Sequence, residues 1–573
     1  MSDVRVRRAI AYCTNKDELI QSVYPLLTPE ERESLVMDSF IPKGHWAYAG
    51  EENIESYTFD PSKGKSLLQE TKWKVSIPNP IRENANGQHL SLGLQVSSAK
   101  FRQTWAKVWI EQMKFCGIDI TLKPSLGWMD FSPRAMFYRD VDMSAMAWIT
   151  QSDPGGKFLY ACDEIPRPGN DWSGLNYMGW CNPLASENII RAEQTLLRQE
   201  KIDAYRIFQQ EFTKDMVSLP LFNRIEIYAM NAELQGVELR TGDWDHYYTW
   251  NIANWEIPGR DLITLGFTQE PASLFTIIED AYVANLAVSL VEGVRTISPS
   301  YELLPVMQKQ IPTLENGVAV NAVVIVQEGD IVYDSVSDLA VLEQKTIVID
   351  SEGKLVQYTG QSISMNQLTV KYEFVDGLKW SDGVPVSKAD FELYYKIACD
   401  EESGATSFII CDSIQTIEFT DKGYTITWVP GMLHSYYFLA PYGFFPAHRV
   451  LSDGRLLADL PAKEWATTPE VTRNPIGAGP YVLKEWIPGD RMVFEANPYY
   501  YGGTPKTKTI IIKFLDPAIA EASLIVGDID FLDSTTLVGV SEALRNAEEA
   551  GLVKIVVVPS STWEHIDMNL YIK

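Results

Sequence analysis

Aromatic side chains are the residues of this sequence best suited to chemistry, and that chemistry is non-covalent ligand binding. The chain holds 16 Trp, 27 Tyr and 22 Phe, and several of the Trp, such as Trp148, Trp380 and Trp563, are predicted in loops or at strand ends. Flat amphipathic rings offer a large contact area at little cost in entropy, which suits a ligand pocket. For any single Trp, packing in the core is the plain alternative.

No catalytic motif accompanies these aromatic residues. The six His include no HExxH, and the sequence has no GxSxG, P-loop or zinc spacing. The segment NPIGAGPY (474–481) lacks the third glycine of a dinucleotide site and is predicted to be a turn that enters a strand. A pair of carboxylates acting as acid and base is the remaining enzymatic alternative, but most of the 76 acidic residues are expected on the surface. We therefore expect a protein that is not an enzyme and that uses no metal or cofactor.

Hydrophobic periodicity predicts a mixed α/β fold. In MSDVRVRRAIAYCTNKDELI (1–20), apolar residues recur at helical spacing from Val6 to Cys13, and Asp3 is placed as the cap. Residues 368–374 alternate as a half-buried strand does, and Ser387 is the predicted cap of a helix that runs to about residue 399. The apolar, β-branched runs at 508–515 and 552–559 are typical of strands buried on both faces.

Length and charge limit the possible architectures and partners. A chain of 573 residues suggests about three or four folded units. The formal charge of −27 repels phosphate backbones, so nucleic acid is not expected as a partner. The sequence has no apolar run near the roughly 18 residues of a membrane span, and its first residues lack the pattern of an export signal.

Four of the six cysteines form two pairs that are close in sequence. Cys162 and Cys181 flank a loop rich in Pro, Gly and Asn, and Cys399 and Cys411 flank a shorter loop. For each pair, a disulfide in an oxidising compartment and two buried thiols remain open alternatives. The other two, at 13 and 116, are predicted on apolar helix faces as core residues.

Six segments together resemble the extracytoplasmic solute-binding proteins of ABC importers in the oligopeptide, dipeptide and nickel class, known as family 5. They are spread over nearly the whole chain: DVRVRRAIAYCTNKDELI (3–20), FDPSKGKSLLQETKW (59–73), MVSLPLFNR (216–224), LTVKYEFVDGLKWSDGVPVSKADFELYYKI (368–397), NPIGAGPYVLKEWIPGDRMVFEANPYYYGGTPK (474–506) and GDIDF (527–531). The resemblance implies a two-lobed, type II periplasmic-binding-protein fold of the large cluster C form with an extra subdomain.

The order of these segments differs from the order in the family. In the family the WSDG-like segment comes early and the DVRVRRAI-like helix comes beyond the middle, whereas here the helix stands first. Starting the sequence near Asp261 and joining residue 573 to residue 1 restores the family order. We therefore expect a circular permutant in which Pro258-Gly259 stands where the ordinary termini are joined, and in which the export signal of the ordinary precursor is absent from this chain.

The resemblance also implies a division into domains. Residues 1–215 and 561–573 are expected to form one lobe, domain II. Residues 216–303 and 471–560 form the other, domain Ia, and residues 304–470 form the extra subdomain, domain Ib. We expect the lobes to close on a hinge around the ligand, in a monomer that is periplasmic or at the cell surface and that docks on the membrane subunits of an ABC importer.

The resemblance places the ligand site in the cleft. Peptide-binding members have a segment similar to W-x-x-D whose aspartate pairs with the peptide amino group; here AWITQSDP (147–154) keeps Trp148 but has Gln151 at that position. An amide gives a weaker bond to an ammonium group than a carboxylate does, and Asp153 is expected to compensate if the loop shifts. The other candidate ligand contacts are Trp563 and His565 from the last strand, Glu279 from the opposite lobe, and Trp380, which has a structural alternative.

Two ligand classes remain open. An oligopeptide is favoured by the habit of the family, and a neutral oligosaccharide of the cello-oligosaccharide type is favoured by Gln151 and the Trp-rich loops. Nickel is disfavoured because the sequence has no clear histidine or acidic cluster, and haem has no support. A hydrolase on the same scaffold is one competing function, and a binding protein would differ from it by returning the ligand intact. An adhesive or chaperone-like surface protein is the other, and it would bind unfolded chains with little discrimination by length.

Overall fold

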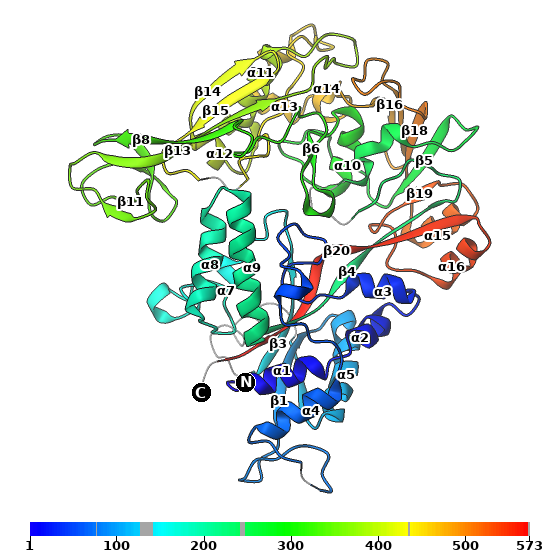
Figure 1. Ribbon diagram of the computed structural model, residues 1–573. Coiled ribbons are helices and arrows are strands. Elements are labelled where there is room, and N and C mark those ends of the chain that lie inside the picture. The colour runs from blue at the N-terminus through cyan, green and yellow to red at the C-terminus, as the bar shows by residue number, and fades with distance from the viewer. Residues whose placement is uncertain (76, 126–140, 241–246, 434–435, 571–573) are drawn as a thin grey trace.

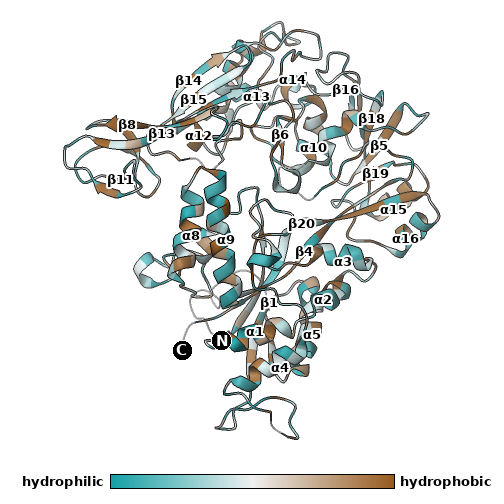
Figure 2. Ribbon diagram, in the orientation of Figure 1, coloured by the Kyte–Doolittle hydropathy of each residue, from teal (hydrophilic) through white to brown (hydrophobic). Residues whose placement is uncertain are grey.

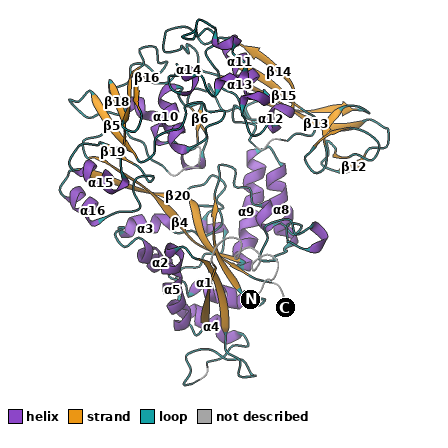
Figure 3. Cartoon of the chain, turned by 180° about the vertical axis from the view of Figure 1, so that it is seen from behind, coloured by secondary structure: helices purple, strands orange, loops and turns teal. Residues whose placement is uncertain are grey.

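The computed structural model describes residues 1–75, 77–125, 141–240, 247–433 and 436–570. Two lobes are connected by a pair of long strands, which Figure 1 and the reverse view in Figure 3 both show. In the described part of the chain, no helix has the length and apolar character needed to cross a membrane.

One ten-stranded sheet extends through both lobes, in the order β16-β17-β18-β5-β19-β4-β20-β3-β1-β2. Its long members are β4 (Ser218–Asn231) and β20 (Val553–Met568), which pair antiparallel. Their register shifts between Pro559 and Trp563 and again between Glu564 and His565. Such irregularities bend a strand and increase its twist.

The first lobe contains one end of this sheet and the helices that cover it (Figure 1). Its strands are β1 (Ser91–Ser97), β2 (Asp119–Ser125) and β3 (Met143–Ile149). Its helices are α1 (Val4–Tyr12), α2 (Lys16–Val23), α3 (Pro29–Leu35), α4 (Pro61–Glu70), α5 (Lys100–Phe115), α7 (Lys157–Tyr160), α8 (Pro183–Gln194) and α9 (Arg198–Asp215). Helix α9 buries Phe208 and Phe212, while its charged residues give it the hydrophilic colour in Figure 2.

The second lobe contains the other end of the large sheet and a separate four-stranded sheet. The large sheet continues here with β5 (Leu262–Phe267), β16 (Tyr481–Ile487), β17 (Arg491–Ala496), β18 (Thr509–Phe514) and β19 (Phe531–Leu532). The small sheet, ordered β14-β15-β13-β8, consists of β8 (Ala319–Val326), β13 (Ile363–Glu373), β14 (Ile414–Thr420) and β15 (Gly423–Trp428). The helices are α10 (Tyr282–Val291), α11 (Lys388–Ala398), α12 (Ile409–Asp412), α13 (Ala462–Trp465), α14 (Pro469–Thr472), α15 (Pro517–Ile525) and α16 (Glu542–Glu549).

Short strand pairs complete the second lobe. Two hairpins lie beside β8, and a third pair follows α10. They are β9 (Ile331–Tyr333) with β10 (Leu339–Val341), β11 (Ile347–Ile349) with β12 (Leu355–Gln357), and β6 (Thr296–Ile297) with β7 (Leu304–Pro305).

Three disulfides are present in the structure. Cys162 bonds to Cys181 and Cys399 bonds to Cys411. A third bond joins Cys13 to Cys116, which directly follow α1 and α5. The sequence predicted both residues in the core, and both are buried, but it did not predict the bond between them. Their separation of 103 residues gives no local signal of a bond.

Candidate functional site

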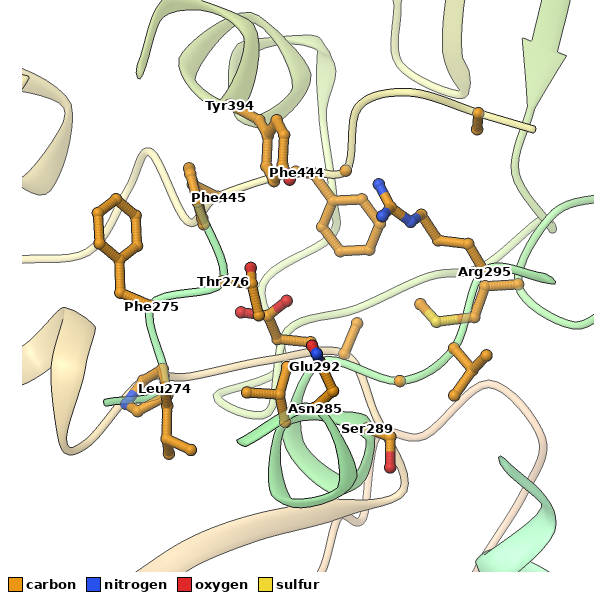
Figure 4. A pocket seen from close by; sticks show the side chains of 18 of the residues that line it. Leu274, Phe275, Thr276, Asn285, Ser289, Glu292, Arg295, Tyr394, Phe444 and Phe445 are labelled. Atoms are coloured by element: carbon orange, nitrogen blue, oxygen red, sulfur yellow. The ribbon is translucent and has the colours of Figure 1, made fainter. Parts of the chain in front are cut away.

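A cavity of about 790 Å³ lies where the two lobes face each other. From the first lobe only Gln151 and Ser152 are among its described lining residues; the rest come from Tyr247 onward, in the second lobe. Its wall is largely aromatic and aliphatic, with a few polar side chains from α10 and the segment that follows it (Figure 4). A mostly apolar hollow with a few placed polar groups is the usual form of a small-molecule site.

Gln151 spans the gap between the lobes. Its Oε1 atom accepts a hydrogen bond from the Tyr436 hydroxyl at 2.9 Å. Its main-chain oxygen lies 2.9 Å from Nε2 of His45, whose Nδ1 accepts the amide of Ala47 at 3.0 Å, so Nε2 carries the proton and donates. Burial lowers the pKa of His45 to about 3, which keeps this ring neutral at physiological pH. His45, which the sequence did not single out, therefore positions Gln151.

The loop around Gln151 has further support from its own lobe. Trp46 Nε1 donates to the Ser152 carbonyl at 2.6 Å. The next residue, Asp153, is buried, and its carboxylate binds the Lys201 ammonium group and accepts the Tyr205 hydroxyl at 3.1 Å. The charge of Asp153 is thus neutralised by α9, and Asp153 does not line the cavity. This geometry differs from the expected compensation for Gln151, because the carboxylate is already bound within its own lobe.

Trp148, Trp563 and His565 come together in a second cluster. Trp148 of β3 and Trp563 of β20 are register partners, and the His565 ring stacks on Trp148 with centroids 6.1 Å apart and packs on Trp563 at 4.6 Å. Trp563 and His565 are buried and Trp148 is half-buried. None of the three is a lining residue of the cavity. The structure therefore joins these three predicted residues to one another, in the sheet next to Gln151.

Glu279 and Trp380 line the cavity on the side of the second lobe. Glu279 accepts the amide of Ala281 at 2.9 Å, just before α10 begins. Trp380 is 2% exposed and meets Phe444 edge-on at 5.3 Å, and its Nε1 atom has no hydrogen-bond partner among the described residues. Both predicted residues therefore lie in the wall of the cavity, and their contact with a ligand stays a prediction.

Five charged residues in the same wall escaped the sequence analysis: Asp280, Glu292, Arg295, Arg449 and Glu470. Glu292, which caps the C-terminus of α10, and Arg295, three residues later, both line the cavity. Burial raises the pKa of Glu292 to about 7, and the charge of Arg295 opposes that shift. Their spacing resembles that of many surface pairs, so only the fold reveals that they face a hollow (Figure 4).

The lobes also meet beside the cavity. Leu196 and Arg198, at the start of α9, contact the second lobe. Arg198 forms an ion pair with Glu302, and its amide donates to Glu315 Oε1 at 2.8 Å. The Tyr437 hydroxyl donates to the Leu196 carbonyl at 3.4 Å.

A two-lobed α/β fold with paired linking strands and an interlobe cavity defines the class of type II periplasmic binding proteins.

Comparison with protein families identifies the chain more narrowly. Residues 1–164 and 355–573 match the bacterial extracellular solute-binding proteins, family 5 Middle, and the chain belongs to this family. That match covers more than half of the sequence.

Individual relatives match over shorter stretches. The dipeptide-binding protein of Escherichia coli is 26% identical over 220 residues, which are 36% of this chain and 35% of that protein. The peptide transport periplasmic protein SapA of Salmonella typhimurium is 25% identical over 249 residues, 42% of this chain and 40% of that protein. The chain thus matches roughly a third of the length of these curated relatives. Among solved structures, the oligopeptide-binding protein of Thermus thermophilus in complex with a pentapeptide aligns with a TM-score of 0.34 at 20% identity, over 38% of this chain and 37% of that one.

Proposed function

We propose that this protein captures a peptide-like solute in the cavity between its lobes and delivers it to the membrane subunits of an ABC importer. The observation that carries the proposal is the cavity itself, with Gln151 of one lobe hydrogen-bonded to Tyr436 of the other beside it. A ligand that contacts both walls favours the closed arrangement of the lobes. The family and the peptide- and dipeptide-binding relatives support the same ligand class.

A neutral oligosaccharide is the second candidate ligand. The neutral amide of Gln151, in place of the aspartate of the W-x-x-D pattern, is the observation that favours it. Charged groups in the opposite wall, from Glu279, Glu292 and Arg295, favour a ligand with charged ends, and so a peptide.

The proposed location is extracytoplasmic, in the periplasm or at the cell surface, with the protein as a monomer. Three disulfides support an oxidising compartment. We also propose the division into domains II, Ia and Ib, with boundaries at residues 215, 303, 470 and 560. Hydrophobic cores around Trp109, Trp255 and Tyr372 support three units. The first core also contains Met216, Leu219, Leu221 and Phe222, which the division assigns to domain Ia.

We also propose the circular permutation. Met1 and Leu570 pack against the same hydrophobic core, and Ile257–Arg260 form a tight turn in which the Arg260 amide binds the Ile257 carbonyl at 3.0 Å. Mass spectrometry of a proteolytic peptide that crosses residues 257–262 tests it, and a chain break there would refute a covalent permutant.

Native mass spectrometry of the purified protein is the test of the proposed function. Tri- to pentapeptides and cello-oligosaccharides are added separately, and the masses of the complexes and of the released ligands are measured. We expect complexes with the peptides and release of peptide with unchanged mass. Complexes with the sugars alone would establish the second candidate, and shortened products would show a hydrolase.

A further inference from the structure

Strand β8 forms an open edge of the second lobe. It ends the order β14-β15-β13-β8 of the small sheet and pairs antiparallel with β13 over all of Ala319–Val326. In an antiparallel pair, alternate residues direct their main-chain N–H and C=O groups to the neighbouring strand, and the remaining residues direct theirs away from it. Among the described residues no other strand pairs with β8, so these outward groups are open to a further strand.

The side chains of β8 are apolar for an exposed edge. The strand reads AVNAVVIV, without charge, proline or glycine, and its register with β13 has no bulge. Val320, Val323 and Ile325 are 52%, 61% and 66% exposed. Charged side chains, prolines and bulges are the usual means by which proteins prevent pairing at a sheet edge. The strand has none of them.

The other edges of the two larger sheets are protected. Strand β14 contains Glu418 and has a shift of register against β15. Strand β16 contains Lys484 and Glu485 and has a shift of register against β17. Strand β2 contains Asp119 and Lys123. The exposed apolar edge is therefore specific to β8, which indicates a surface that a partner covers.

The surroundings of β8 are acidic. The strand leads into two hairpins, and Figures 1 and 3 both show this hairpin arm, residues 319–358, projecting from the second lobe. Acidic residues outnumber lysines in the arm, with Glu328, Asp330, Asp334, Asp338, Glu343, Asp350 and Glu352 against Lys345 and Lys354. A second copy of the chain would bring two such acidic arms together, whereas a basic segment is attracted to them.

We propose that β8 binds an extended, basic segment of a partner protein, which adds a further strand to the small sheet. The main chain of this segment pairs with the outward N–H and C=O groups of β8. Its apolar side chains cover Val323 and Ile325 on one face of the sheet and Val320 on the other, because side chains alternate between the faces. Its lysine or arginine residues meet Glu328 and Asp330, which come directly after β8. The strand does not line the cavity, so this surface is independent of the solute.

A fluorescein-labelled peptide tests the proposal. The probe is acetyl-Lys-Val-Thr-Val-Thr-Val-Lys-amide, and its binding to the full-length protein is measured by fluorescence anisotropy at low and at physiological salt. We expect saturable binding that weakens with salt, and at least about ten-fold weaker binding of the same peptide with Glu in place of both Lys. Methylation of the main-chain nitrogens of either all Val or all Thr residues separates the two edges of the peptide. One methylated peptide should lose binding, and the other should keep it within about three-fold.

Val323→Lys changes the edge, and Leu355→Lys on β12 is the matched control. Both residues are exposed, both changes add the same charge to the hairpin arm, and both residues lie outside its small core around Val332 and Tyr358. Val323→Lys should weaken binding of the basic peptide at least about ten-fold, because it places a charge on the edge, whereas Leu355→Lys should change it by less than about three-fold. Ile325→Lys, on the same face as Val323, should repeat the result.

Several outcomes would overturn the proposal. No binding of the basic peptide, equal binding of the acidic peptide, or equal effects of the two patterns of methylation would exclude the addition of a basic strand to β8. Equal losses in Val323→Lys and Leu355→Lys would show attraction by charge alone. Analytical ultracentrifugation without peptide tests the other occupant, since a dimer that Val323→Lys abolishes would make a second copy of the chain the partner.

Discussion

Removal of the Cys13–Cys116 disulfide probes what holds the first lobe together. The bond ties the end of α1 to the end of α5, and both residues are buried. The Cys13 sulfur also packs on α4, where a Cβ atom at Gly64 would lie only 2.5 Å from it. Three helices therefore meet at this bond, and the variant C13A/C116A releases them from one another.

The length of the closed loop gives the expected magnitude. In the chain-entropy description, a crosslink over 103 residues restricts the unfolded chain by about 4.7 kcal/mol at 25 °C. The Cys399–Cys411 bond closes only 12 residues, which corresponds to about 2.8 kcal/mol. C399A/C411A is therefore the matched control, with a smaller expected loss by about 2 kcal/mol.

Urea unfolding at 25 °C, followed by tryptophan fluorescence, measures both losses. Trp105 and Trp109 are completely buried in the core that contains Cys13 and Cys116, so unfolding of this lobe changes the total emission. Buried tryptophans of the second lobe, such as Trp428, report on the region of the control bond. We expect C13A/C116A to lose more stability than C399A/C411A, without a change in the far-ultraviolet spectrum before the transition. An equal or larger loss in the control would refute the argument from loop length.

Three further predictions concern single side chains. Burial raises the pKa of Glu292 from 4.5 to about 7, so its contribution to the free energy of unfolding is complete below about pH 4.5 and is lost as the pH rises through 7. Glu292→Gln should remove about 3 kcal/mol of the difference in unfolding free energy between pH 4.5 and pH 8, as measured by urea titration. An unchanged difference would contradict this prediction. Glu564 is completely buried between Arg102 and Arg224. Glu564→Gln should lower the free energy of unfolding by about 3 to 5 kcal/mol in the same assay, and a loss below about 1 kcal/mol would show that the two ion pairs contribute little. Tyr436→Phe removes the hydrogen bond to Gln151 and should weaken peptide binding about five-fold in calorimetry. Tyr499→Phe, at an exposed position, is the control and should leave binding unchanged. Equal effects of the two variants would contradict a role of the bond between Tyr436 and Gln151 in peptide binding.

Local sequence signals predicted the elements wherever capping and periodicity act within a few residues. The helix after Ser387 runs over Lys388–Ala398 with a capping box from Asp390, and the predicted strands at 508–515 and 552–559 correspond to β18 and the start of β20. The opening stretch (1–20) forms two helices. Asn15 accepts the Glu18 amide and starts α2, so the apolar stripe ends at Cys13.

The candidate site was less predictable, because its residues meet only in the folded chain. Gln151 and Tyr436 are 285 positions apart, and Gln151 and His45 are 106 apart. A family motif located Gln151, but the sequence carries no signal that pairs it with a tyrosine or a neutral histidine. For Asp153, the family motif predicts a ligand contact, but the sequence carries no signal of the ion pair that its carboxylate forms with Lys201 of α9.

The uneven lining of the cavity predicts an order of events for the proposed capture of a solute. Nearly all described lining residues belong to the second lobe, and the first lobe supplies Gln151 and Ser152. The polar contacts between the lobes beside the cavity include an ion pair of Arg198 and Glu302, each with a side chain 47% exposed, and such exposed pairs contribute little. Other direct contacts between the lobes add to this pair, among them Leu196 in the core around Tyr372 and the His45 ring 4.7 Å from the Tyr301 ring. A ligand that contacts both sides stabilises the closed arrangement further. The solute should dock first on the wall of the second lobe, after which the first lobe closes over it through Gln151.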